Sequence, residues 1–140
     1  MDKFKEIRPV VLGLAKRNNK ILVREIYDKK EKKTFYRSLG GGIEFQETSE
    51  EALKREFKEE LNIDITVKDF LGVFENIFAF EGKKAHEIIL FYNIEIKEED
   101  YKDSYNIIDE KEDTNVYWID VEEFKKGNKI LYPIELIKYL

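Results

Sequence analysis

The sequence predicts an α+β fold, or a layered α/β/α domain, in which a mixed sheet packs against few helices. Three observations predict it. Runs rich in β-branched and apolar residues cover 7–15 and 20–27, two longer strand patterns cover 65–80 and 87–96, and the clearest helix covers 48–61. Because the chain has 140 residues, we expect one domain over 1–140.

The N-terminal part begins with a predicted hairpin whose turn is Lys16–Asn19. A charged loop follows over 28–33, and a short strand over 35–39 leads into a glycine loop, Gly40–Gly42. Thr48 and Glu51 form a capping-box pattern at the start of the helix. Asn62 can adopt the left-handed conformation that ends helices.

The C-terminal part contains weaker signals. We expect a turn at 81–83, an acidic polar loop over 97–115 and a short strand over 116–119. Asp120 with Glu123 predicts a short capped helix to Lys126, and Pro133 suits the first turn of a closing helix ending near Leu140.

The composition excludes several classes of function. A net charge of −5 argues against stable nucleic-acid binding and against membrane binding. The chain has no cysteine, which rules out disulfides and thiolate sites. The N-terminus lacks a signal-peptide core, and no apolar run is long enough to span a bilayer, so we expect a cytoplasmic protein.

Two glutamates of the helix lie where apolar residues are expected. On a helical wheel, Glu56 and Glu60 fall inside the arc marked by Ala52, Leu53 and Phe57. They repel each other at i and i+4, by roughly 0.2–0.5 kcal/mol, and have no basic residue at i±3 or i±4. Partly buried carboxylates need a cationic partner.

Two partners would satisfy them. One is a lysine or arginine from elsewhere in the chain, and the other is a divalent cation, because Mg²⁺ and Mn²⁺ prefer carboxylate oxygens. Gly40, Gly41 and Gly42 lie just before this helix. They let the backbone approach a metal or a phosphate closely, although three glycines also make an ordinary turn.

The stretch from Gly41 to Ile63 resembles the signature of the Nudix hydrolase family, G-x5-E-x7-R-E-U-x-E-E-x-G-U, where U is a bulky apolar residue. Every spacing matches. The matching positions are Gly41, Glu47, Arg55, Glu56, Phe57, Glu59, Glu60 and Ile63. Asn62 replaces the last glycine, and outside the defined positions Leu39 and Gln46 replace a common proline and glycine.

This resemblance implies a MutT-like α/β/α sandwich with a mixed sheet and a loop–helix–loop Nudix box. It implies that Glu56, Glu59 and Glu60 bind Mg²⁺ or Mn²⁺ or serve as the base, with Glu56 our first candidate for the base. Glu47 would pair with Arg55. Further expected ligands are the carbonyl of Gly40 and, from the loop before Trp118, Glu112, with Glu110 as its competitor and a solvated loop carboxylate as the simpler alternative.

The resemblance also implies hydrolysis of a pyrophosphate linkage in a nucleoside diphosphate linked to another group. We favour a (deoxy)nucleoside triphosphate. The alternatives are ADP-ribose, a nucleotide sugar, a dinucleoside polyphosphate, or a nucleotide-sensing domain without catalysis. We expect a monomer or a homodimer with a small-molecule nucleotide as its partner.

Substrate contacts are expected near the glycines. Gly41 and Gly42 leave room for phosphate, and Arg24 and Arg37 lie on strands where they bind either phosphate or surface carboxylates. His86 is a general base, a stacking group or a hydrogen-bonded structural residue. The aromatic residues that are candidates either for stacking a base or for the core are Tyr27, Phe74, Phe78, Phe80 and Tyr92.

Overall fold

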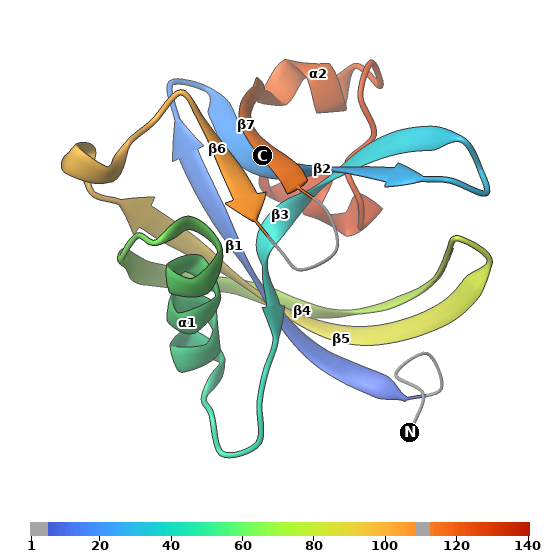
Figure 1. Ribbon diagram of the computed structural model, residues 1–140, viewed down its shortest axis with the longest axis horizontal. Coiled ribbons are helices and arrows are strands. Elements are labelled where there is room, and N and C mark those ends of the chain that lie inside the picture. The colour runs from blue at the N-terminus through green and yellow to red at the C-terminus, as the bar shows by residue number, and fades with distance from the viewer. Residues whose placement is uncertain (1–5, 109–112) are drawn as a thin grey trace.

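A computed structural model describes residues 6–108 and 113–140 (Figure 1). Its strands are β1 (Ile7–Arg17), β2 (Lys20–Asp28), β3 (Lys33–Gly42), β4 (Ile65–Phe80), β5 (Lys83–Ile96), β6 (Ser104–Ile108) and β7 (Asp113–Asp120). The helices are α1 (Ser49–Leu61) and α2 (Val121–Lys125), with 3₁₀ turns η2 (Glu98–Asp100) and η3 (Ile134–Tyr139). None of these helices is long and apolar enough to cross a membrane.

The strands form one mixed sheet in the order β4-β5-β1-β3-β2-β7-β6. β1 runs parallel to β5, and the other pairs are antiparallel. β3 joins the two halves, because its residues Leu39–Gly42 pair with β1 while Lys33–Ser38 pair with β2. The predicted α+β architecture with a mixed sheet is confirmed.

Alternate residues of β1 enter two different cores. Val11 and Ala15 pack in the core under α1, whereas Val10, Leu12 and Leu14 pack in the core that includes α2 and η3. Because successive side chains of a strand point to opposite faces, the two helical layers cover opposite faces of the sheet. This is the layered arrangement that the sequence predicts.

Helix α1 has the ends expected from its sequence. The Thr48 hydroxyl accepts a hydrogen bond from the Glu51 amide at 3.1 Å, and the Glu51 carboxylate accepts one from the Thr48 amide, also at 3.1 Å. Asn62 is left-handed, with φ 57° and ψ 38°, and its amide donates to the carbonyl of Lys58. The capping box and the left-handed helix end are both confirmed.

Two expectations about loops are wrong. Gly40–Gly42 do not form a loop, because β3 continues through them and pairs with Val10–Leu12 of β1. The segment over 97–115 is not one polar loop, since it contains η2, β6 and the start of β7. Tyr105 and Ile107, two residues apart on β6, are buried in the core under α1, and this burial holds the strand. The closing helix is a 3₁₀ helix.

We expect Asn62→Ala to lower the free energy of unfolding by about 1 kcal/mol, because alanine has no local polar side chain to stabilise the left-handed conformation. Asn62→Gly should match or exceed the parent. Chemical denaturation measures both. Asn106→Ala, on the exposed side of β6, is the control and should change stability by less than about 0.5 kcal/mol. Equal stability of the alanine and glycine variants at 62 would contradict the role of backbone conformation.

Candidate active site

The buried side of α1 fixes where its carboxylates lie. Ala52, Leu53, Phe57 and Leu61 are buried in the core beneath the helix. Glu56 and Glu60 sit beside this apolar stripe, so both are carried against the sheet, and only 15% and 17% of their side chains are exposed. The inward placement inferred from the wheel is confirmed.

Gly41 provides the space in which Glu56 lies. A β-carbon at Gly41 would come within 2.5 Å of the Glu56 carboxyl group. At Gly40, with φ 153°, a β-carbon would collide with the carbonyl of Val11 on β1. Gly40 therefore lets β3 pair closely with β1, and Gly41 lets the backbone of β3 lie against the Glu56 carboxyl group of α1.

Arg55 is the centre of a hydrogen-bonded cluster. It donates to both carboxylate oxygens of Glu47, at 2.7 and 3.0 Å, and to the carbonyl of Gly42 at 2.9 Å. It also donates to Glu56 at 3.0 Å and to Glu59 at 3.3 Å. The hydrogen bonds from Arg55, followed by one from the Glu44 amide, lower the pKa of Glu47. Hydrogen bonding to Glu47 in turn raises the pKa of Arg55.

The negative charge of Glu60 has weaker compensation from nearby cationic groups than that of Glu47. Burial, followed by the nearby charge of Glu56, raises its pKa to about 8, while Arg24 acts in the opposite direction. The Arg24 guanidinium is 3.9 Å from the Glu60 carboxylate. Arginines thus reach both inward glutamates, Arg55 from the adjacent helix position and Arg24 from β2. The raised pKa shows that Arg24 does not offset the burial of Glu60, so this carboxylate would still gain from a cation.

The residues present fit a divalent cation that takes only some of its ligands from the protein. Among the described residues, no three acidic, histidine or cysteine side chains converge on one point. Glu59 is 60% exposed and turned toward Arg55. Glu56 and Glu60 are the close pair, and Mg²⁺ is commonly held by one or two carboxylates together with waters and substrate phosphates. Glu112 and its competitor Glu110 lie outside the described residues.

The two candidate arginines have different surroundings. Arg24 and Arg37 are partners across β2 and β3, but only Arg24 is paired with Glu60 of the helix. Arg37 donates to Glu87 at 2.8 Å, and Glu87 is only 4% exposed. Arg8 lies 3.8 Å from the same carboxylate. Arg37 is therefore held in an ion pair at the base of a cavity.

Arg8 and Glu87 were not predicted as site residues. A β-carbon at Gly42 would come within 3.1 Å of the Arg8 guanidinium, so Arg8 lies between the glycines and Glu87. The available signal in the sequence was Glu87 at the start of a predicted strand, directly before the apolar run from Ile88 to Phe91. Such a charge needs a partner from another strand, and the partner is visible only after folding.

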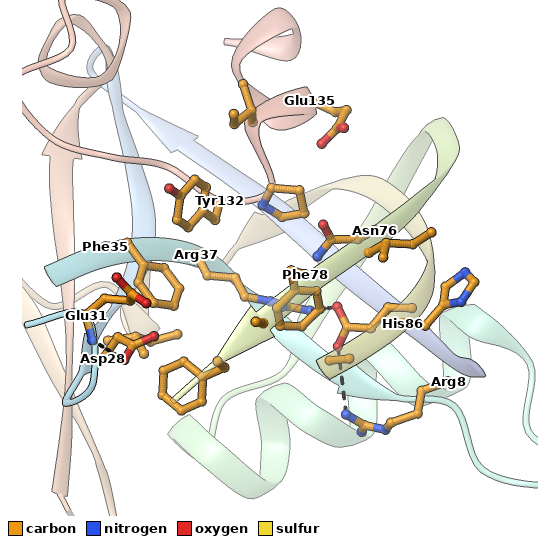
Figure 2. Close-up of a pocket in the computed structure, with 18 of the residues that line it drawn as sticks. Arg8, Asp28, Glu31, Phe35, Arg37, Asn76, Phe78, His86, Tyr132 and Glu135 are labelled. Carbon is orange, nitrogen blue, oxygen red and sulfur yellow. Dashed lines mark hydrogen bonds and ion pairs between the residues drawn. The ribbon is translucent and has the colours of Figure 1, made fainter. Parts of the chain in front are cut away.

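A cavity of about 630 Å³ opens between the β2–β3 and β4–β5 hairpins. In the view of Figure 2, Phe35 and Tyr132 lie on one side of it and His86 on the other, with Arg37 and Phe78 in between. Phe80 also lines it, and the segment Tyr132–Glu135 closes one side. The cavity thus combines aromatic walls with the Arg37–Glu87 ion pair, and Arg8, which also lines it, lies against Gly42 of β3.

The hairpin tips are joined at the outer end of this cavity. The Asp28 carboxylate accepts a hydrogen bond from the Glu81 amide at 3.1 Å, and the Glu81 carboxylate accepts one from the Lys29 amide at 3.3 Å. Hydrogen bonds from backbone amides, the largest contribution being from Glu31, lower the pKa of Asp28. The β2–β3 and β4–β5 turns are therefore held together.

The aromatic candidates separate into three groups. Phe78 and Phe80 line the cavity. Phe74 and Tyr92 pack with the two cores, and the Tyr92 hydroxyl is 2.8 Å from that of Ser49. Tyr27 is 52% exposed and is not among the cavity residues. His86 borders the cavity, but its imidazole points away from Phe35 and Tyr132 (Figure 2), and its Nε2 has no hydrogen-bond partner in the described part of the chain.

Comparisons with known proteins agree with this architecture. The family model described as the NUDIX domain matches residues 7–138. An uncharacterised Nudix hydrolase from Nostoc sp. is 31% identical over 103 residues, which are 74% of this chain and 49% of that protein. The chain therefore spans about half the length of this curated relative.

Solved structures show the same fold. A NUDIX-family hydrolase from Clostridium perfringens superimposes with a TM-score of 0.63 at 19% identity, covering 96% of this chain and 95% of that one. A MutT NUDIX hydrolase from Burkholderia pseudomallei gives a TM-score of 0.62 at 22% identity, covering 84% and 85%.

We expect Gly41→Ala to fold but to displace the Glu56 carboxyl group, because the new β-carbon would meet the end of a flexible side chain. The rise in melting temperature on adding Mn²⁺ or Mg²⁺ should fall or vanish in this variant. Gly42→Ala is the matched control. Its β-carbon meets only the end of Arg8, at 3.1 Å, so the metal-dependent rise should remain. An unchanged metal response in Gly41→Ala would disprove the role given to this contact.

Proposed function

The chain belongs to the Nudix family, and we propose that it hydrolyses a pyrophosphate linkage in a nucleoside diphosphate linked to another group. The observation that carries this proposal is the pair of inward carboxylates, Glu56 and Glu60, held beside Gly41 and Arg55. Buried carboxylates that lack full compensation from the protein suit a site that binds a cation and a polyphosphate together.

Each residue has a proposed role. Glu60 and Glu59 would hold Mg²⁺ or Mn²⁺, with Glu56, the Gly40 carbonyl and Glu112 as further candidate ligands. The bound cation would neutralise pyrophosphate charge and increase the acidity of water in the site. Glu47 orients Arg55, and Arg55 in turn holds the Glu56 carboxylate by the 3.0 Å hydrogen bond.

The reaction is substitution at phosphorus. The oxygen of a water molecule forms a bond to phosphorus, the P–O bond of the anhydride breaks, and the leaving phosphate keeps the electron pair. Glu56 accepts the proton that the water loses. Arg24, 3.9 Å from Glu60, would contact phosphate oxygens, and Gly41 and Gly42 let the chain of phosphates approach the backbone of β3.

The cavity would hold the nucleoside part of the substrate. Its volume of about 630 Å³ lies within the range of small-molecule sites, and Phe35, Phe78 and Tyr132 offer aromatic surfaces for a base. Arg37 is held by Glu87 and would shape the base of the cavity rather than bind phosphate. We favour a (deoxy)nucleoside triphosphate as the substrate.

We expect Glu60→Gln to lower kcat by at least about 100-fold on any true substrate, because it weakens the binding of the cation that stabilises the transition state. Phosphate release measures this, on a panel of NTPs, dNTPs, ADP-ribose, nucleotide sugars and dinucleoside polyphosphates with Mg²⁺ or Mn²⁺. Glu50→Gln, an exposed glutamate on the same helix, is the control and should keep full activity. Equal activity of the two variants would refute the assignment. A panel without turnover would favour the nucleotide-sensing alternative.

We expect Phe35→Ala to raise KM about 10- to 100-fold with a smaller effect on kcat, because loss of stacking on a base costs roughly 1–3 kcal/mol. Tyr27→Ala, an exposed aromatic outside the cavity, should leave KM unchanged. Steady-state kinetics on the best substrate of the panel separates the two constants. A loss confined to kcat would show that the cavity does not hold the nucleoside.

A further inference from the structure

The guanidinium of Arg37 has more hydrogen-bond donors than the protein uses. Its side chain is only 18% exposed, and its Nη2 atom donates to Glu87 at 2.8 Å. Within the part of the chain that the structure describes, this is the only hydrogen bond of the Arg37 side chain. Because arginine carries five N–H groups and no acceptor, four of them are left for water or for a ligand.

The unused donors of Arg37 are open to the cavity, which this residue lines. Among residues 6–108 and 113–140, the fully buried side-chain polar atoms without a partner are Ser38 Oγ and His86 Nε2, so no free nitrogen of Arg37 is sealed off. A guanidinium has two edges that each present two parallel N–H groups, and Nη2 belongs to both edges. Since Glu87 takes one hydrogen of Nη2, one complete edge stays free.

The free edge of Arg37 lies beside an aromatic wall. Phe35, two residues earlier on β3, projects from the same side of the strand (Figure 2). The Phe35 ring contacts those of Tyr132 and Phe80, with centroid distances of 5.2 and 6.1 Å. The ion pair with the buried Glu87 fixes the guanidinium next to this wall. A flat ring that packs on the wall can therefore turn an edge toward Arg37.

Free acceptors are scarce in the same cavity. Its two buried carboxylates are those of Asp28 and Glu87. Asp28 accepts hydrogen bonds from three backbone amides, and Glu87 is paired with Arg37 and Arg8. The amide of Asn76 carries both donors and an acceptor, so it can pair with any nucleobase and distinguishes little between them. The cavity therefore favours a ring that presents acceptors to the free edge of Arg37.

Nucleobases differ in how they meet two parallel donors. Guanine presents O6 and N7, and cytosine presents N3 and O2, as two adjacent acceptors on one edge. In adenine the acceptor N7 lies next to the amino group, which is a donor. In uracil and thymine a ring N–H lies between the two carbonyl groups. An arginine edge can thus bind guanine or cytosine through two hydrogen bonds at once, and its contact with O6 and N7 of guanine is the commonest base-specific contact in protein–DNA complexes.

We propose that Arg37 selects the nucleobase of the substrate, so that the site takes nucleotides of guanine or cytosine in preference to those of adenine, uracil or thymine. This inference rests on the proposed function, which puts the nucleoside in the cavity. The aromatic wall holds the ring of any nucleobase, and the free edge of Arg37 distinguishes between them. Arg37 binds the substrate in this role and takes no part in bond cleavage.

Isothermal titration calorimetry with nucleoside 5′-monophosphates tests this proposal, because these compounds have no pyrophosphate linkage and are not consumed. GMP and CMP should bind about 10-fold more tightly than AMP and UMP, which is the discrimination expected of one two-donor contact. In 7-deaza-GMP a carbon replaces N7, and in 8-oxo-GMP N7 carries a hydrogen. Each of these two compounds should lose most of the advantage of GMP.

A conservative variant tests the residue itself. Arg37→Lys keeps a positive charge beside Glu87 but loses the two parallel donors. It should lower the affinity for GMP and CMP about 10-fold, while AMP and UMP bind as they do to the parent, which also shows that the variant is folded. Arg17→Lys is the matched control, since Arg17 is likewise hydrogen-bonded to a glutamate, Glu98, but does not line the cavity. All four affinities should be unchanged in this control.

The outcomes separate this inference from the proposed function. Equal affinities for the four monophosphates would overturn the role of Arg37 and leave the proposed hydrolysis standing. The same holds if 7-deaza-GMP binds as tightly as GMP, or if Arg37→Lys keeps the preference. If no monophosphate bound, the placement of the nucleoside in the cavity would fail, and this inference with it. Base-selective binding without turnover of any compound in the substrate panel would instead overturn the proposed hydrolysis alone.

Discussion

The bidentate contact between Arg55 and Glu47 is the constraint on which the site depends. It ties the segment after β3 to the middle of α1, and the same guanidinium holds the carbonyl of Gly42 and the carboxylate of Glu56. Arg55 also donates to Glu59, so one backbone carbonyl and three acidic side chains share one cation. Because the guanidinium is planar and offers five donors in a fixed geometry, a lysine could not hold all of these groups at once.

The glycines of β3 make room for this cluster. They belong to a strand, and because they have no side chain, neighbouring groups can approach the strand closely. Gly40 lets β3 pair closely with β1, and Gly41 lets the Glu56 carboxyl group lie against the strand. The close approach concentrates negative charge near Glu60, whose pKa is raised to about 8 chiefly by burial. The ionised form of Glu60 is therefore unfavourable in the protein alone, and a cation bound together with a polyphosphate would stabilise it.

Both halves of the sheet contribute residues to the cavity. β3 belongs to both halves, and the cavity lies between the two hairpins, with Arg8 of its lining placed against Gly42 of β3. The Arg37–Glu87–Arg8 cluster forms the base of this cavity and separates it from the opposite side of β5.

The sequence by itself determined the features that depend on neighbours within a few residues. Helical periodicity placed Glu56 and Glu60 on the inward arc, and the chemistry of Thr48 and Asn62 located both ends of α1. The resemblance to the Nudix family rested on spacing of the same short range.

The structure decided the contacts between distant segments: β3 continues through the glycines because β1 pairs with them, and β6 forms because Tyr105 and Ile107 are buried under α1. Arg24 and Arg8 reach Glu60 and Glu87 from other strands for the same reason. Pairing between strands and burial of charge depend on residues far apart in the chain, and no local pattern specifies which of them meet.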